Sequence, residues 1–274
     1  MAKKTTQETK LNIYRIVCII LALILIVVLI LYGRNLLTQS KAEKKLEEMA
    51  SQVNDVSDMN QSYSDDTYVS ESLGLEIPRK NLNWEALHKE NGDIYAWIYI
   101  PNTMVDYPIL QHPTDDTYYL EHNIDGSTGY PGCIYTELQN SKDFSDFNTL
   151  IYGHNMKSGK MFRTLHDFED STFFNENRYI YIYTEEQVLV YEIFAAYERD
   201  DAHILNTNDF SKRTGCMEYI ESLERIRDMS AHVRSDVELT AESNIITLST
   251  CTGSDDRRYL VQAVLINDNF EWGR

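Results

Sequence analysis

The pattern of hydrophobic and polar positions divides the chain into two unlike parts. Near the N-terminus, sixteen consecutive residues from Ile16 to Leu31 are apolar. The longer stretch from Ile13 to Tyr32, interrupted only by Arg15, reaches the roughly 20 residues that a helix needs to cross a bilayer. No small-residue cleavage site such as Ala-x-Ala follows it, which favours an uncleaved anchor over a removed signal peptide. We therefore predict a short tail over residues 1–12 and a transmembrane helix over residues 13–32.

The segment that follows the anchor is polar. Residues 51–75 are rich in Ser and Asp and have little apolar periodicity, as in a flexible linker. Just before them, a charged stretch carries apolar residues three and four positions apart, which predicts a helix with one apolar side. We therefore predict a helical stalk and a flexible linker over residues 33–79. The apolar positions of the stalk are Leu46, Met49 and Val53.

The rest of the chain, residues 80–274, reads as one folded domain of mainly β structure. Eight short segments have the composition and spacing of strands, and eight strands are typical of a closed barrel with flanking helices. Two helices are predicted between them, one near Met161 to Phe168 and a longer one around Asp209 to Met229, whose apolar residues should pack on the core. The predicted strands are Tyr95–Ile100, Val105–Gln111, Gly132–Thr136, Asn148–Tyr152, Tyr179–Tyr183, Val188–Tyr197, Asn244–Thr250 and Arg258–Ile266.

The charge of the chain limits the partners that it can bind. Asp and Glu number 43 against 25 Lys and Arg, for a net charge of −18, and no basic cluster follows Lys45. A face that binds nucleic acid needs clustered Lys and Arg to contact phosphates, so a nucleic-acid partner is excluded. We interpret the acidic residues as a solvated surface.

The four cysteines are widely separated. Cys18 lies in the apolar stretch, and the others have no Cys-x-x-Cys spacing, so they form neither a zinc site nor an obvious disulfide framework. Outside the cell, the three cysteines of the folded domain, Cys133, Cys216 and Cys251, cannot all pair. At least one free thiol is expected.

Cys251 is the strongest candidate for a catalytic residue. The run Thr247-Leu248-Ser249-Thr250-Cys251 closes an apolar strand, and polar residues follow at once. A thiol at that boundary lies at the rim of a barrel, where it can act as a nucleophile. Ser249 lies on the same strand face and could add a hydroxyl. The alternative is a buried cysteine that fills space in the core, as free cysteines often do.

A histidine and two arginines also lie at predicted strand ends. His154 follows an apolar strand in the run Gly153-His154-Asn155, where the glycine lets the backbone turn and leaves space beside the imidazole. No closely spaced pair of histidines suits a metal, so an acid or base role is favoured over a metal role. Arg257 and Arg258 precede the last strand, and a guanidinium there can hold a carbonyl oxygen. The alternatives are an exposed histidine and a solvated pair of charges.

These segments resemble the sortases, and most closely those of class B. The Thr-Leu-Ser-Thr-Cys run matches the sortase signature, and the resemblance extends over about residues 80 to 270. It departs from the family in a short, acidic loop between the cysteine and the arginine and in a long linker before the barrel, which bear on substrate preference. Other segments that carry it are 97–111, 152–156, 161–162, 179–184 and the helix near 209–229.

The resemblance implies a closed eight-stranded sortase-type barrel and a cysteine transpeptidase. Cys251 is expected to be the nucleophile, His154 the general acid and base, and Arg258 the group that positions substrate and stabilises the oxyanion, with Ser249 in support. Arg257 is the second choice, because sortases place the arginine directly before the strand that follows the cysteine loop. No cofactor and no metal are implied, and the Asp115-Asp116 and Asp255-Asp256 pairs lack the spacing of a calcium loop.

The implied partners are secreted proteins with a C-terminal sorting signal, an amine acceptor on a peptidoglycan precursor or a pilin, and the membrane lipid around the anchor. We expect a single-pass protein of the cell membrane with its N-terminus in the cytoplasm and its catalytic domain outside. The positive-inside rule does not decide this orientation. Lys3, Lys4, Lys10 and Arg15 lie before or at the start of the anchor, and Arg34, Lys41, Lys44 and Lys45 lie after it.

Two other classes of function use the same features. A membrane-anchored cysteine peptidase would use Cys251 and His154 but let water resolve the acyl-enzyme. A non-catalytic surface binding module would use the barrel surface and no thiol.

Overall fold

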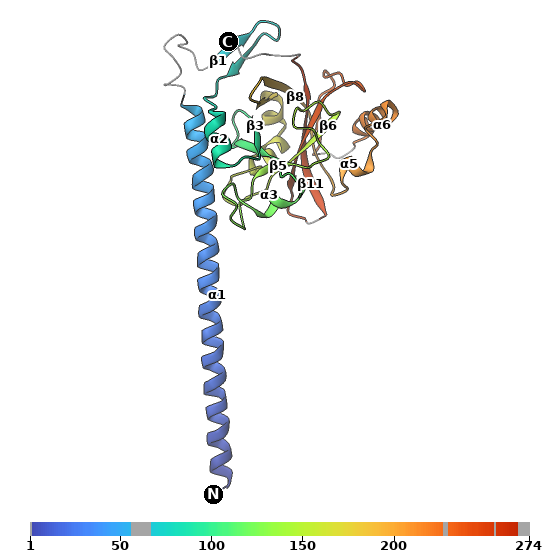
Figure 1. Ribbon diagram of the computed structural model, residues 1–274. Helices are drawn as coiled ribbons and strands as arrows, with labels where there is room; N and C mark the ends of the chain where they lie inside the picture. Colours follow the sequence, from blue (N-terminus) through green and yellow to red (C-terminus); the bar gives the residue numbers. More distant parts are fainter. Residues whose placement is uncertain (1, 56–66, 227–229, 255, 268–274) are drawn as a thin grey trace.

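In the computed structural model, one long N-terminal helix lies beside a β domain and extends well past it (Figure 1). The structure describes residues 2–55, 67–226, 230–254 and 256–267. Helix α1 (Ala2–Asn54) is continuous from the predicted anchor to the end of the predicted stalk. Its apolar residues from Ile16 to Leu31 are exposed, and the helix is long and apolar enough to cross a membrane. An exposed surface of this kind is stable in lipid and costly in water.

The last turns of α1 pack on the β domain. The three apolar residues of the predicted stalk, Leu46, Met49 and Val53, are buried in the main core. Polar contacts flank them, because Lys160 forms ion pairs of 2.9 Å with Glu43 and Glu47 of the helix. The charged stretch therefore has one side that belongs to the folded domain.

The helix end is tied to the barrel by a buried charge pair. Lys80, whose side chain is 2% exposed, pairs with Asp106 at 2.8 Å. Asn54, the last residue of α1, donates to the same carboxylate at 2.8 Å, and Trp97 donates to it at 2.7 Å. Burial lowers the pKa of the Lys80 ammonium, and the nearby Asp106 charge opposes that shift.

Part of the predicted linker is folded. Strands β1 (Thr67–Ser70) and β2 (Leu75–Pro78) form an antiparallel hairpin in it. The sequence pattern missed this hairpin because both strands are short and β2 has one fully buried residue, Ile77. Residues 56–66 of the predicted linker lie outside the described residues.

The predicted eight-stranded barrel is confirmed. The strand order is β11-β10-β6-β5-β4-β3-β7-β8, and the pairing of β8 with β11 closes the ring. A two-residue strand, β9 (His232–Val233), adds to the side of β8. The barrel strands are β3 (Ile94–Tyr99), β4 (Asp106–Leu110), β5 (Ile134–Thr136), β6 (Asn148–Tyr152), β7 (Tyr179–Tyr183), β8 (Val188–Asp200), β10 (Ile245–Cys251) and β11 (Arg257–Leu265).

The two helices predicted between the barrel strands are shorter than expected. The segment near 161–168 is the 3-10 helix η1 (Arg163–Glu169). The segment around 209–229 contains α6 (Arg213–Glu224), which starts late because Asp209 accepts hydrogen bonds from Ser211 and Lys212 in a local turn. Residues 227–229 of that prediction lie outside the described residues. The other helices are α2 (Trp84–Glu90), α3 (Tyr118–Glu121), α4 (Ser171–Glu176) and α5 (Ile204–Thr207).

Two apolar clusters form the core. The larger one fills the barrel, and the smaller one lies between the barrel wall and α6, where Tyr219 and Leu223 are buried. Met217, on the same helix, is 37% exposed, so the predicted apolar stripe packs only in part. The smaller cluster holds the long connection between β8 and β10 against the barrel.

Candidate active site

The candidate site lies where two parallel strands of the barrel end together. Strands β6 and β10 pair in parallel, with Ser249 opposite Tyr152. Beyond the last ladder pair, Gly153 donates to the Ser249 carbonyl at 3.2 Å, and the Thr250 hydroxyl donates to the Gly153 carbonyl at 2.8 Å. If this register continued, Cys251 would lie opposite His154, at the spacing of about 4.8 Å between paired strands.

Cys251 is exposed at the end of β10, whose other residues are buried. It therefore does not fill space in the core. All four cysteines are free thiols, and Cys133 and Cys216 of the folded domain are buried. Burial raises the pKa of both of these thiols.

His154 is held from the side of α3. Its Nε2 lies 2.8 Å from the Leu120 carbonyl, and the Tyr130 ring meets it edge-on with centroids 4.9 Å apart. Gly132 makes this approach possible, since a Cβ there would lie 2.7 Å from the Tyr119 carbonyl and 3.4 Å from the imidazole. These neighbours come from a segment that the sequence did not connect with His154.

Gly153 has a different role from the one predicted. A Cβ at this position would lie 2.5 Å from Ile134 and 2.7 Å from Phe162. Its backbone is not in the left-handed region that requires glycine. The glycine is therefore needed because Ile134 and Phe162 pack closely against its backbone, and the turn itself does not require glycine.

The two arginines at the start of β11 have different surroundings. Arg258 lies directly opposite Cys251 in the antiparallel ladder between β10 and β11. Arg257 donates from Nε to Glu198 of β8 at 2.9 Å, and both side chains are partly exposed. Neighbouring residues on a strand face opposite sides, so Arg257 contacts β8 while Arg258, which donates to the Arg257 carbonyl at 2.9 Å, borders the pocket described next.

A pocket of about 180 Å³, lined by both polar and apolar residues, opens beside Arg258 and Ser249. Ser249 is 6% exposed and lies two residues before the thiol, on the same strand face. The far wall is held by His203, whose Nε2 lies 2.7 Å from Glu137 and 3.4 Å from the Tyr152 hydroxyl. The sequence did not single out His203 or Glu137.

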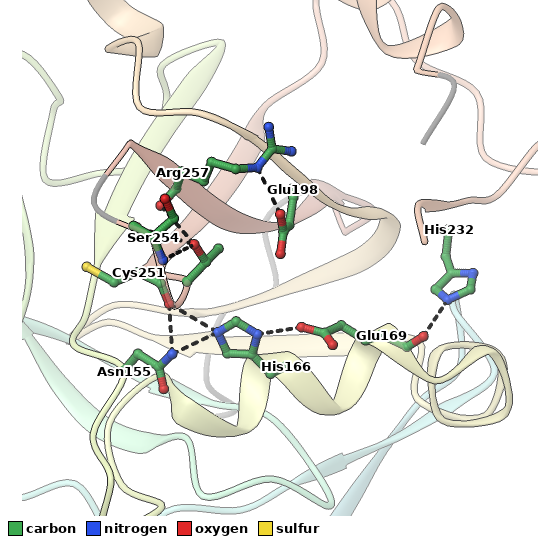
Figure 2. A network of polar contacts seen from close by, with 9 residues as sticks. Asn155, His166, Glu169, Glu198, His232, Cys251, Ser254 and Arg257 are labelled. Atoms are coloured by element: carbon green, nitrogen blue, oxygen red, sulfur yellow. Dashed lines mark hydrogen bonds and ion pairs between the residues drawn. The ribbon is translucent and has the colours of Figure 1, made fainter. Parts of the chain in front are cut away.

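A second polar network supports the main chain at Cys251 (Figure 2). Asn155 donates from Nδ2 to the Cys251 carbonyl at 2.8 Å, and His166 Nε2 lies 3.1 Å from the same oxygen. His166 Nδ1 is 2.5 Å from Glu169, and its ring stacks on Tyr259. In Figure 2 the Cys251 sulfur points away from His166, so the network contacts the backbone and does not involve the exposed thiol. The adjacency of Asn155 to His154 was the only sequence signal for it.

Three residues of the acidic pairs considered as calcium ligands accept hydrogen bonds within the domain. Asp115 accepts from the Thr117 amide at 2.9 Å, and Asp116 accepts from the Leu138 amide at 2.6 Å. Asp256 accepts from the Ser254 hydroxyl, and Asp255 lies outside the described residues. Among the residues that the structure covers, no group of three or more His, Cys, Asp or Glu side chains is arranged to hold a metal.

Comparison with known proteins identifies the family. The sortase domain model matches residues 98–266. Sortase B of Listeria monocytogenes is 34% identical over 183 residues, which are 66% of this chain and 72% of that protein. Sortase B of Staphylococcus aureus is 27% identical over 168 residues, which are 61% of this chain and 67% of that protein.

Comparison with solved structures also finds sortases of class B. The crystal structure of Bacillus anthracis sortase B in complex with AAEK1 superposes with a TM-score of 0.65 at 27% identity, covering 84% of this chain and 98% of that one. The Listeria monocytogenes sortase B structure gives a TM-score of 0.57 at 33% identity, covering 66% and 99%.

The chain therefore belongs to the sortase family, in its class B. It is a sortase transpeptidase. Family membership and the apolar part of α1 together support membrane anchoring.

Proposed function

We propose that the chain cleaves a C-terminal sorting signal of secreted proteins and joins the new carboxyl end to an amine. The amine belongs to a peptidoglycan precursor or to a pilin. The proposal rests on the pairing of β6 with β10: Cys251 is the last residue of β10, His154 follows the end of β6 by two residues, and Arg258 lies opposite Cys251 in register.

The first half of the reaction forms a thioacyl intermediate. The Cys251 sulfur attacks the carbonyl carbon of a threonine in the sorting signal, and the peptide C–N bond breaks as the thioester forms. The departing amine takes a proton from His154. Because Nε2 of His154 lies at the Leu120 carbonyl, Nδ1 is the nitrogen that we assign to this proton transfer.

The second half transfers the acyl group. His154, now neutral, takes a proton from the incoming amine, which attacks the thioester carbonyl and forms a new amide bond. The Cys251 sulfur leaves and the enzyme returns to its starting state. The products are the anchored protein, the C-terminal fragment released in the first step and the regenerated enzyme. Cys251 attacks and leaves as the thiolate, and His154 gives one proton to the departing amine and takes one from the incoming amine, so protons and bonds balance over the two steps.

Arg258 is assigned to the substrate carbonyl oxygen. Its position opposite Cys251 and beside the pocket supports this role, since a cation there stabilises negative charge that develops on the oxygen. Ser249 is assigned a weaker supporting role, because its hydroxyl borders the same pocket. Arg258 is favoured over Arg257 because it lies opposite Cys251 in the ladder, whereas its neighbour Arg257 faces the other side of the strand.

The location of the protein follows from the same proposal. A sorting signal on a secreted protein and a lipid-linked acceptor both reach the outer membrane surface, so the catalytic domain is placed outside and residues 1–12 in the cytoplasm. Tethering through α1 then raises the effective concentration of both substrates at the site.

One experiment separates transfer from its alternatives. The full chain in detergent is mixed with a sorting-signal peptide and an amine acceptor, and the joined product is sought by mass spectrometry. Cys251→Ala should abolish the product, whereas Cys18→Ala, which removes a thiol from the apolar segment, should not. Hydrolysed peptide at saturating amine would indicate a peptidase, and peptide binding without cleavage would indicate a binding module.

A further inference from the structure

The domain meets α1 close to the point where the helix leaves the bilayer. The apolar stretch ends at Tyr32, and a Cβ built on Gly129 would lie 3.3 Å from the Asn35 side chain. At 1.5 Å per residue, Asn35 is only about 4.5 Å farther along the helix than Tyr32. The headgroup layer on each side of a bilayer is about 5–7 Å thick. With residues 13–32 crossing the bilayer along its normal, Gly129 would lie at the level of the lipid headgroups.

Large apolar side chains are exposed at this edge. Tyr130, the next residue, is 51% exposed, and Leu120 is 39% exposed. A 2.7 Å hydrogen bond from the Gly129 amide to the Glu121 carbonyl holds their two segments together. In Figure 1, α3 lies at the end of the domain that faces the N-terminal half of α1. A tyrosine, with an apolar ring and a polar tip, suits the membrane interface.

We propose that Tyr130 and Leu120 form a lipid-contacting edge, at which the catalytic domain rests on the bilayer surface. The proposal depends only on membrane anchoring through α1, and not on the substrates or on which side of the membrane the domain lies. It is therefore tested separately from the transpeptidation proposed above.

The same two residues hold His154. The Tyr130 ring packs on the imidazole, and the Leu120 carbonyl lies 2.8 Å from its Nε2. Farther along the helix, Lys160 pairs with Glu43 and so fixes the chain after His154 to α1. The lipid contact and the helix contact together fix the height of the histidine above the bilayer.

The edge is not suited to electrostatic binding. Residues 118–131 include Glu121 and Asp125 but no Lys or Arg. An electrically neutral phosphatidylcholine surface is therefore the appropriate partner, and the contact rests on the aromatic and aliphatic groups and on the tether.

The test uses the full chain in phosphatidylcholine vesicles that contain a lipid with a nitroxide on its headgroup. Tyr130→Trp places a fluorescent reporter at the proposed edge. Met104→Trp is the matched control, because Met104 is 50% exposed and lies two residues from Asp106. Asp106 contacts Asn54, which is about 33 Å farther along α1 than Tyr32.

We expect the fluorescence added by the tryptophan of Tyr130→Trp to be blue-shifted and to be quenched by the headgroup nitroxide. The fluorescence added by Met104→Trp should show neither effect. Equal quenching of the two would overturn the proposal. Thermal unfolding checks that each variant folds, and Leu120→Trp replaces Tyr130→Trp if the latter does not.

A second variant moves the whole domain. Seven helix-forming residues inserted after Gly33 add nearly two turns, so the domain keeps its side of the helix but rises by about 10 Å. Quenching of the reporter at position 130 should then disappear. Quenching that persists after this insertion would also overturn the proposal.

Discussion

Asn155 reaches across 96 positions of the sequence to donate a 2.8 Å hydrogen bond to the main-chain carbonyl of Cys251. His166 approaches the same oxygen and is itself held by Glu169. These contacts fix the backbone at the proposed nucleophile from the side opposite to its sulfur (Figure 2). Sortase activity in this chain should therefore depend on residues that do not touch the substrate.

Asn155→Ala should lower kcat for peptide joining by roughly 10- to 100-fold, because small misplacements of a reacting group are costly, and should change KM little. Asn155→Asp should be equally impaired, since a carboxylate cannot donate the hydrogen bond. The measurement is steady-state kinetics of product formation, with thermal unfolding to compare folding. A kcat equal to that of the unmodified chain in both variants would show that the hydrogen bond does not position Cys251.

The neighbouring arginines should respond differently to the same substitution. Arg258→Ala should reduce kcat/KM by about 10²- to 10³-fold, as expected for loss of a group that stabilises an oxyanion. Arg258→Lys should recover only part of the activity, because an ammonium lacks the guanidinium fork. Arg257→Ala removes a partly exposed pair with Glu198 and should cost about 1 kcal/mol of stability or less. If Arg257→Ala were the inactive variant, the two roles would have to be exchanged.

The thiols should differ in reactivity. Cys251 is exposed, whereas Cys133 and Cys216 are buried, and burial raises the pKa of both buried thiols. A bulky maleimide should therefore modify Cys251 in the folded chain and the other two only after unfolding in urea. Peptide mapping by mass spectrometry identifies the modified residue. Rapid labelling of Cys133 without urea would contradict the burial described above.

The sequence predicted the barrel strands well because their residues alternate or are continuously apolar, as in Tyr179–Tyr183 and Val188–Tyr197. It also singled out Cys251, His154 and Arg258 as candidates, because each lies at the end of an apolar run and the resemblance to sortases gives each a role. Their arrangement depends on the parallel pairing of β6 with β10, which joins segments about 100 residues apart. No local pattern specifies such a register.

Other features depend on tertiary contacts alone. His166 could not be connected with Cys251, because it lies in a short 3-10 helix whose position is set by packing on β11. The sequence pattern indicated that the stalk has an apolar side. It did not indicate what this side packs on, because Leu46 and Met49 belong to a core built from residues far along the chain. Periodicity indicates which side of an element is buried, and it does not identify what covers that side.

The docking of α1 should weaken in acid because of Glu43, whose side chain is 12% exposed. Burial raises the pKa of its carboxyl, but hydrogen bonds from Gln39 and Lys160 and the Lys160 charge outweigh that effect and hold the pKa below its ordinary value of 4.5. A carboxyl with a lowered pKa stabilises the fold above its unfolded-state pKa, and this stabilisation is lost as the pH falls through the folded-state pKa.

Glu43→Gln should accordingly lower the free energy of unfolding by about 1 kcal/mol at neutral pH, near the upper end for an ion pair at a protein surface. The difference from the unmodified chain should shrink between about pH 7 and about pH 3, because the native carboxyl is then protonated as well. Urea unfolding at the two pH values provides the measurement. Glu48→Gln is the control, since Glu48 pairs with Lys44 on the exposed side of the same helix and should have a smaller effect at both pH values. A Glu43→Gln difference that stayed constant with pH would mean that the ion pair with Lys160 does not hold the helix against the domain.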